Sequence, residues 1–206
     1  MENRWVGLLP SQVEPQEKMP TVEDDSVEVL RGAGKPHVGL SVPTGAPAEE
    51  VLSDGSGLHW LGAHGGSGET TLATLLGGRA CEHLWPRLEN SGGEAIATLL
   101  VARRNHSGMQ AASAAARRWA SGAHEDVALV GLVLVDDAPG KVPRELQRQA
   151  KVLSGAVPRT WVIPWIEDLR VYGETEIARL SHAAAKHLAA LREVVEEHTP
   201  ANERKL

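Results

Sequence analysis

The sequence predicts an α/β domain with a mostly parallel β-sheet and flanking helices, preceded by a disordered N-terminal tail. Two observations lead to this prediction. From residue 58 onward, apolar runs of strand length alternate with amphipathic runs of helix length, the pattern of β–α–β units with right-handed crossovers. One run, over residues 127–135, has nine apolar residues without alternation, which is typical of a central parallel strand buried on both faces.

The first 56 residues differ in composition from the rest of the chain. Ten acidic and four basic residues precede Gly57, a net charge of −6 that equals the formal charge of the whole chain, so the remainder is neutral. Six prolines interrupt any helix in this segment, and such compositions bury little apolar surface. We therefore expect a flexible acidic tail over 1–56, one domain over 57–198 and a short C-terminal tail over 199–206.

Composition also excludes several classes of protein. A single cysteine, Cys81, excludes a disulfide framework and is typical of a reducing cytoplasm. No apolar run has the length of a membrane span, and the first residues lack the charged-then-apolar pattern of a signal peptide. We expect a cytoplasmic protein without membrane contact. The neutral body offers no general footprint for nucleic acid, so a nucleic-acid partner would need a local basic patch.

The expected elements follow in a regular order. A short buried strand over 58–62 leads through a glycine-rich turn into a helix over 70–76, which Gly77 and Gly78 end. Pro143 opens a later helix, because proline suits the first helical turn. The remaining expected elements are strands over 95–102, 127–135 and 160–163 and helices over 108–121 and 177–195.

The most informative stretch is the turn between the first strand and the first helix, with the sequence GAHGGSGETT. Glycines let backbone N–H groups converge at a helix N-terminus, where the helix dipole also attracts anions. The hydroxyl groups of the two threonines stand where they could bind Mg²⁺. We therefore expect a phosphate-binding loop formed by Gly65, Gly66, Ser67, Gly68, Glu69, Thr70 and Thr71.

This loop resembles the deviant Walker A loop of ParA/MinD-type ATPases, which belong to the SIMIBI class of P-loop NTPases. In that loop a lysine precedes two glycines, a variable residue and a third glycine, and a second lysine and two Thr or Ser positions follow. Three glycines and both threonines match here, but His64 stands at the first lysine position and Glu69 at the second. The resemblance implies a P-loop NTPase-like fold with ATP and Mg²⁺ as ligands. The loss of both lysines implies a degenerate loop, and the alternative is that no cofactor binds.

Glu69 is the departure with the largest consequence. In the family the second lysine contacts the β- and γ-phosphates, so a carboxylate there replaces attraction by repulsion. At about 4 Å and an effective dielectric constant of about 20, each unit-charge interaction is about 4 kcal/mol, which is enough to abolish tight triphosphate binding. A cation from elsewhere, such as Lys141 or Arg144, is one way to compensate. A role that needs no ligand is a favourable interaction of Glu69 with the N-terminal dipole of its helix.

Two aspartates follow the strand over 127–135, at the edge of the sheet where α/β folds bind ligands. In ParA/MinD-type ATPases the Walker B strand ends in an aspartate that is closely followed by proline. Pro139 and Gly140 follow here, so the resemblance assigns catalysis to Asp136 or Asp137 and Mg²⁺ binding to Asp136 together with Thr70. Aspartate, proline and glycine are also turn formers, which is the alternative interpretation.

A late segment completes the expected site. Pro164 and Trp165 take the place of the loop that lies beside adenine in related ATPases, and the tryptophan face can stack on a base, pack in the core or contact a partner. Arg103 and Arg104 end the strand over 95–102, where ParA/MinD proteins often have an aspartate. We interpret these two arginines as part of a solvated loop, with anion binding as the alternative.

The body also resembles an uncharacterised actinobacterial family that is often found with mobile elements. Three stretches within residues 57–172 carry this resemblance: LHWLGAHGGSGETTLA, GLVLVDDAPGKVPRELQRQ and VPRTWVIPWIEDLR. The resemblance supports the expected fold and implies no reaction.

Three functions follow as alternatives. The first is a degenerate P-loop NTPase-fold protein that acts with a protein partner as a regulatory or interaction module, in partition or transfer of mobile-element DNA. The second is an active Mg²⁺-dependent ATPase of ParA/MinD type with a rewired lysine. The third is a DNA-associated accessory protein whose basic patch comprises Arg103, Arg104, Arg117 and Arg118. Relatives dimerise around nucleotide through the first loop lysine, so His64 disfavours that dimer and leaves other homodimers open.

Overall fold

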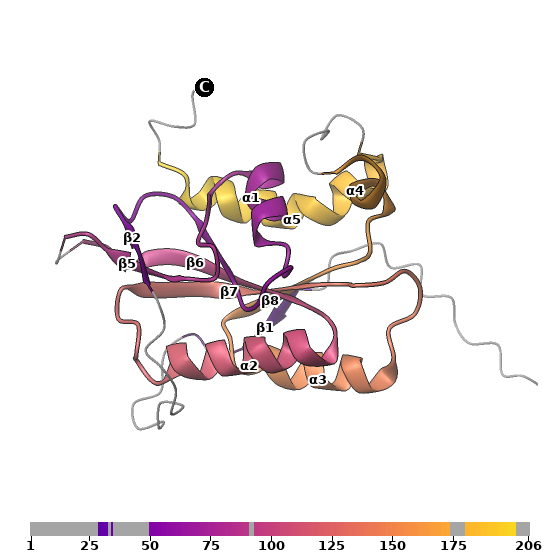
Figure 1. The fold of residues 1–206 in the computed structure, drawn as a ribbon, viewed down its shortest axis with the longest axis horizontal. Coiled ribbons are helices and arrows are strands. Elements are labelled where there is room, and N and C mark those ends of the chain that lie inside the picture. Colours follow the sequence, from indigo (N-terminus) through magenta and orange to yellow (C-terminus); the bar gives the residue numbers. More distant parts are fainter. Residues whose placement is uncertain (1–28, 33, 35–49, 91–92, 174–179, 201–206) are drawn as a thin grey trace, which may run out of the picture.

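The computed structural model describes residues 29–32, 34, 50–90, 93–173 and 180–200. Within them a central sheet lies between two layers of helices (Figure 1). The helices on one face are α1 (Glu69–Leu76), α4 (Glu167–Tyr172) and α5 (His182–His198), and those on the other are α2 (His106–Ala120) and α3 (Arg144–Ser154). The expected fold class, α/β with a mostly parallel sheet and flanking helices, is confirmed.

The main sheet has six strands in the order β1-β8-β7-β6-β3-β4. All neighbours pair in parallel except β1, which runs antiparallel to β8. The strands are β1 (Val29–Arg31), β3 (His59–Gly62), β4 (Arg79–Ala80), β6 (Ile96–Arg103), β7 (Val127–Val135) and β8 (Arg159–Ile163). The parallel strands follow the doubly wound order 2-1-3-4-5, and the direction of winding reverses between β3 and β6. Sheets of this kind bind ligands at the carboxyl ends of their strands, where the winding reverses.

β7 is the central strand of the fold, with β6 and β8 as its neighbours. Leu132 and Leu134 belong to the core cluster that α2 and α3 cover, and Val133 belongs to the cluster that α1 and α5 cover. A fully buried side chain of this kind contributes roughly 1.5–3 kcal/mol relative to an exposed one. The prediction that this strand is buried on both faces is confirmed.

Two strands come from the segment that composition assigned to the tail. β1 adds to the edge of β8, and β2 (Glu50–Ser53) pairs in parallel with β5 (Trp85–Leu88) in a separate two-stranded sheet. The expected domain boundary at residue 57 therefore does not mark the start of the fold. Edge pairing is driven by backbone N–H and C=O groups, so strands this short carry little side-chain pattern. The other parts of the expected tails, 1–28, 35–49 and 201–206, lie outside the described residues.

The last helix also differs from its expected bounds. It begins at His182 because Ser181 caps it, and Ser181 Oγ accepts a hydrogen bond from the Ala184 N–H at 3.3 Å. The earlier part of the expected helix includes residues 177–179, which lie outside the described residues. In the part of the chain that the structure describes, no helix is long and apolar enough to cross a bilayer.

Two histidines with buried side chains link the small sheet to the rest of the domain. His59 in β3 is 2% exposed, and its Nε2 lies 2.8 Å from Ser53 Oγ in β2. His124 stacks on Trp85 of β5 with ring centroids 3.9 Å apart. Burial is the main cause that holds the pKa of each of these histidines below its ordinary value.

From the lowered pKa values of these histidines we expect the free energy of unfolding to decrease in acid. A histidine with a lower pKa in the folded state than in the unfolded state binds fewer protons when folded, so the free energy of unfolding falls as pH drops below the unfolded pKa of about 6.5. We expect urea titrations to show this decline below about pH 6.5, with a slope of at most about 1.4 kcal/mol per pH unit for each histidine.

The decline should be smaller in His59→Gln. The control variant His182→Gln changes an exposed histidine at the start of α5 and should retain the wild-type profile. Equal pH profiles for wild type and His59→Gln would contradict the role assigned to His59.

Candidate ligand-binding site

The glycine loop connects β3 to α1 at the carboxyl edge of the sheet. Gly68 is the N-cap of α1 and has a φ of 104°, a left-handed conformation that favours glycine. The helix that follows begins with Glu69, whose carboxylate turns back toward Gly62 at the start of the loop. The loop therefore has the strand–turn–helix setting of an anion-binding loop, with a carboxylate beneath it.

Glu69 is only 3% exposed, and its carboxylate binds groups outside its own helix. Its Oε2 accepts a hydrogen bond from the Gly62 N–H, and its Oε1 accepts one from the His83 N–H at 3.1 Å. The His83 imidazole lies beside the same carboxylate, with Nδ1 3.4 Å from Oε2. Glu69 thus holds the first residue of the loop and the turn at 81–84 together.

The space beneath the loop is tightly filled. A Cβ atom on Gly62 would lie within 2.6 Å of Glu69 Oε2, His83 Nδ1 and Ser67 Oγ, so only glycine fits there. Within the described residues, Ser67 Oγ is buried without a hydrogen-bond partner. Glu82 and His83 have positive φ values of 53° and 67°, which are uncommon for residues with side chains and concentrate at functional sites.

Cys81 is buried in the same region. Burial, and secondarily the charge of Glu69, raise the pKa of Cys81 to about 12. The thiol is therefore protonated at physiological pH and lacks the thiolate that a nucleophile or metal ligand needs.

Two arginines at the end of β6 stand between the glycine loop and Asp136, because β6 lies between β3 and β7. Arg103 donates from Nε to Gly66 O at 3.0 Å and from Nη1 to Asp136 O at 3.1 Å. Arg104 donates from Nε and Nη2 to the two carboxylate oxygens of Asp136, at 2.5 and 2.8 Å. The interpretation of these arginines as a solvated loop is wrong, since the Arg104 side chain is 15% exposed and both are bonded to neighbouring loops.

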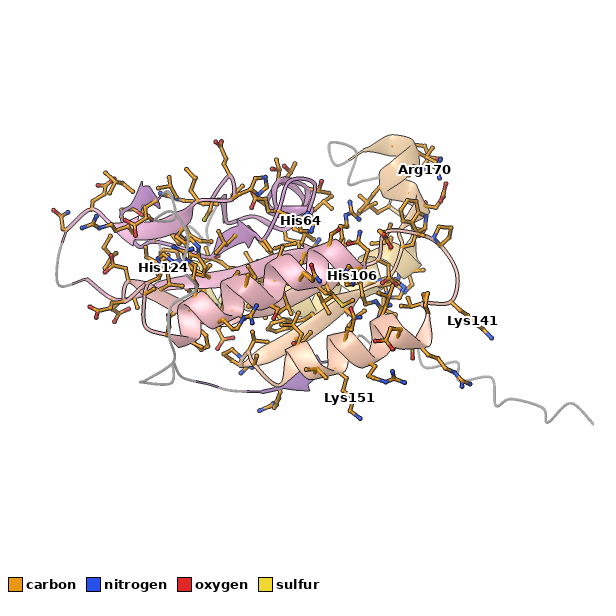
Figure 2. The ribbon with its side chains drawn as sticks, turned by 60° about the horizontal axis from the view of Figure 1, so that its bottom comes forward. His64, His106, His124, Lys141, Lys151 and Arg170 are labelled. Carbon is orange, nitrogen blue, oxygen red and sulfur yellow. The ribbon has the colours of Figure 1, made fainter. Side chains whose placement is uncertain are left out.

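His64, labelled in Figure 2, contacts the end of β6. Its Nε2 accepts a hydrogen bond from the Arg103 N–H at 3.1 Å, and its Nδ1 lies 2.9 Å from Gly65 O. These two contacts require the neutral tautomer with its proton on Nδ1. The imidazole therefore ties the loop to the end of β6.

One pocket brings together much of the expected site. It has a volume of about 270 Å³ and lies at the carboxyl ends of β7 and β8, next to the start of α1 and to α4. The expected residues in its lining are Gly68, Thr71, Asp136, Pro164 and Trp165. Arg103 and Arg170 add positive charge, and the remaining lining residues are Leu72, Val135, Ile163, Ile166, Leu169 and Leu188. An apolar lining with a few polar groups is common in small-molecule sites.

A smaller hollow of about 200 Å³ lies over the glycine loop and shares Gly68, Thr71 and Arg103 with the pocket. Its other lining residues are Gly66, Ser67, Glu69, Thr70 and His83. Thr70 and Asp136, the expected Mg²⁺ ligands, thus line different hollows.

Two further expected residues, Gly65 and Asp137, line neither hollow. Asp137 Oδ2 instead accepts a hydrogen bond from Asn105 Nδ2 at 3.0 Å. Both carboxylate oxygens of Asp136 already bind Arg104, so a metal ion at Asp136 would have to displace that arginine.

Trp165 and Arg170 lie together on the wall of the pocket. The Arg170 guanidinium carbon is 5.9 Å from the centroid of the Trp165 ring, within the range of a cation–π interaction. Trp165 Nε1 donates to Glu167 Oε2 at 2.6 Å. Figure 2 shows Arg170 on α4, whereas Lys141, one of the expected substitutes for the lost lysine, points away from the domain.

The sequence analysis did not include His83 and Arg170 among the site residues, and it gave Arg103 only an alternative role in anion binding. The feature that could have indicated a site role for Arg103 is its place at the carboxyl end of an expected parallel strand. His83 lies in an irregular turn and Arg170 in a six-residue helix, where no hydrophobic period indicates a structure.

The model of a protein family of unknown function (DUF6668) matches residues 56–184. No curated protein and no solved structure matches the chain. The matched segment includes the glycine loop, both arginines of β6 and every lining residue of the pocket except Leu188.

The buried contacts of Glu69 predict that Glu69→Gln destabilises the fold. The amide keeps one acceptor oxygen but turns an NH₂ group toward a backbone N–H, and a buried donor without a partner costs about 1–3 kcal/mol. Glu145→Gln, on the exposed face of α3, is the control and should change the free energy of unfolding by no more than about 0.5 kcal/mol. Urea unfolding measures both, and equal losses would contradict the role assigned to Glu69.

The Arg104–Asp136 pair predicts a measurable coupling energy. A double-mutant cycle with Arg104→Gln and Asp136→Asn should give about 1–3 kcal/mol, because each single variant leaves a largely buried group without its partner. The matched cycle on the exposed pair Arg148 and Glu145 should give less than about 1 kcal/mol. If urea unfolding gives the same coupling for both cycles, Arg104 does not fix Asp136 as described.

Proposed function

The chain belongs to the family of unknown function DUF6668, and we propose that its α/β domain is a degenerate P-loop-like module that binds an anionic, ring-containing ligand of nucleotide type without ordinary triphosphate hydrolysis. In this proposal the bound ligand controls interaction with a protein partner. The observation that carries the proposal is the pocket beside the glycine loop, which combines a helix N-terminus, two arginines and a tryptophan.

The end of the pocket at the glycine loop suits an anion. Gly68 and Thr71 belong to the start of α1, where backbone N–H groups and the helix dipole attract negative charge. Arg103 lines both hollows and carries a charge at every physiological pH. Two of its five N–H donors bind Gly66 O and Asp136 O, so its guanidinium is already oriented between the two hollows.

The other end of the pocket suits a flat ring. Pro164 and Trp165 line it together with aliphatic side chains from β8 and α4. Stacking of a base on an aromatic side chain contributes about 1–3 kcal/mol. The arginine near the loop and the tryptophan beyond it therefore match a ligand with a phosphate at one end and a base at the other.

Two carboxylates argue against ordinary hydrolysis. In the resemblance to the ParA/MinD-type loop, Glu69 takes the position of the lysine that contacts phosphate. Its carboxylate oxygens instead accept hydrogen bonds beneath the loop. Asp136 stands where a Walker B aspartate would hold Mg²⁺, and both of its oxygens bind Arg104. These contacts support binding without lysine-based turnover.

The second candidate is an active ATPase in which another cation takes over the role of the lysine. The position of Arg103 is the observation that favours it. Arg103 lines both hollows, whereas Lys141 and Arg144 are exposed and line neither. If turnover occurs, Arg103 is therefore the cation that replaces the lysine.

The DNA-associated alternative has less support from the described residues. Arg103 and Arg104 precede α2, while Arg117 and Arg118 lie in its last turn. A helix of this length separates the two pairs by about 20 Å, so they do not form one patch. A role in partition or transfer of mobile-element DNA stays a prediction from the resemblance.

Calorimetric titration of the full chain with ATP, ADP and GTP, each with and without Mg²⁺, tests the proposal. We expect the wild type to bind at least one of them, and Trp165→Ala to bind about tenfold more weakly or worse because it loses the stacking face. Val152→Ala, on the exposed side of α3, is the control and should retain wild-type affinity.

Phosphate release measured in the same samples separates the candidates. Binding without release supports a non-hydrolysing module, and release that disappears in Arg103→Gln supports the rewired ATPase. If the wild type binds none of the three nucleotides, both candidates are rejected.

A further inference from the structure

A second and larger hollow lies beside the Arg104–Asp136 pair, between α3 and the edge of the sheet. Its volume is about 750 Å³. Three cations line it, Arg31 from β1, Arg104 from the end of β6 and Lys151 from α3, and Asp136 is the only acidic residue in its lining. The net charge of the lining is therefore +2, in a chain whose formal charge is −6.

The single carboxylate in the lining of this hollow does not neutralise its three cations. Asp136 is bonded to Arg104, which leaves the positive charges of Arg31 and Lys151 as the excess, and both side chains are exposed. The walls also contain apolar groups from Val142 and Val162. A mixed hollow of this kind fits a short acidic peptide with interspersed apolar residues, because such a peptide supplies carboxylates and apolar side chains together.

The chain itself contains such a peptide directly before β1 in the sequence. The sequence EDDSVE, residues 23–28, has four carboxylates and no cation and directly precedes β1. These six residues lie outside the described residues. β1 runs antiparallel to β8, with Val29 opposite Trp161 and Arg31 opposite Arg159, so the preceding chain enters from the carboxyl end of β8. Val162 and Asp136 line the hollow at that end, within reach of six residues, which span at most about 20 Å.

We propose that residues 23–28 dock in this hollow and that their carboxylates bind Arg31 and Lys151. Single exposed ion pairs are weak, but a tethered segment has an effective concentration in the millimolar range, so several weak contacts suffice. This inference does not depend on the proposed function, because it concerns a different ligand and a hollow whose lining has only Asp136 in common with the pocket. A nucleic-acid backbone is the competing occupant of a basic hollow, and the test separates the two.

Carbodiimide cross-linking of the full chain tests the docking, since it joins a carboxylate to a lysine amine only at contact. We expect peptide mass spectrometry to find Lys151 joined to a carboxylate of residues 23–28. Lys186 on α5, across the sheet, serves as the internal control and should show no such enrichment. The Lys151 link should fall to the Lys186 level in 1 M salt, where the screening length is about 3 Å.

Matched variants identify the hollow. Arg31→Gln should reduce the Lys151 link, whereas Arg148→Gln, an exposed cation of α3 outside the hollow, should leave it unchanged. A Lys151 link no stronger than that of Lys186 would overturn the proposal.

A binding experiment covers the case in which Arg31→Gln does not fold. A synthetic peptide of residues 19–28 should bind the full-length variant E23Q/D24N/D25N/E28Q more tightly than it binds the wild type, whose hollow is already occupied. Equal binding to both chains would overturn the proposal. A DNA duplex that binds both chains equally, and loses affinity in Lys151→Gln, would assign the hollow to nucleic acid instead.

Discussion

The arginine pair at the end of β6 is the constraint on which the site depends. Because the sheet places β6 between β3 and β7, the last residues of β6 must stand between the glycine loop and Asp136. Arg103 binds main-chain oxygens on both sides, and Arg104 neutralises the Asp136 carboxylate, which is 7% exposed. A carboxylate this deeply buried needs a charged or hydrogen-bonded partner. Side-chain hydrogen bonds therefore join these three loops in addition to the sheet.

The same arrangement changes the interpretation of the glycine loop as an anion-binding site. Its strand–turn–helix setting and the left-handed Gly68 are those of an anion-binding loop. Yet Glu69 in this loop has a structural role whether or not a ligand is present, because its carboxylate accepts hydrogen bonds from Gly62 and His83. The positive charge next to the loop comes from Arg103 on the neighbouring strand. The loop GAHGGSGETT contains no lysine or arginine, whereas the fold brings a cation to it from another element.

The long elements were predictable because each buries a face with a clear period, as in β7 and α2. The rule that α/β sheets bind ligands at the carboxyl ends of their strands also led to the expectation of Asp136, which lines the candidate pocket. Five of the expected site residues line the pocket: Gly68, Thr71, Asp136, Pro164 and Trp165. Strand order is not a local property of the sequence. No pattern could therefore show that Arg104 binds Asp136, that His83 lies against Glu69, or that β1 pairs with β8.

Asp136 lines both the pocket beside the glycine loop and the larger hollow near α3. Asp136 is therefore common to both, and Arg104, which binds its carboxylate, lines the larger hollow. Any molecule that draws either charge toward itself alters the field on the other side. If both proposed occupants bind, this shared residue couples them, and thermodynamic reciprocity requires that each occupant change the affinity of the other by the same factor. The Arg104–Asp136 ion pair is the interaction that would carry this coupling between the two proposed sites.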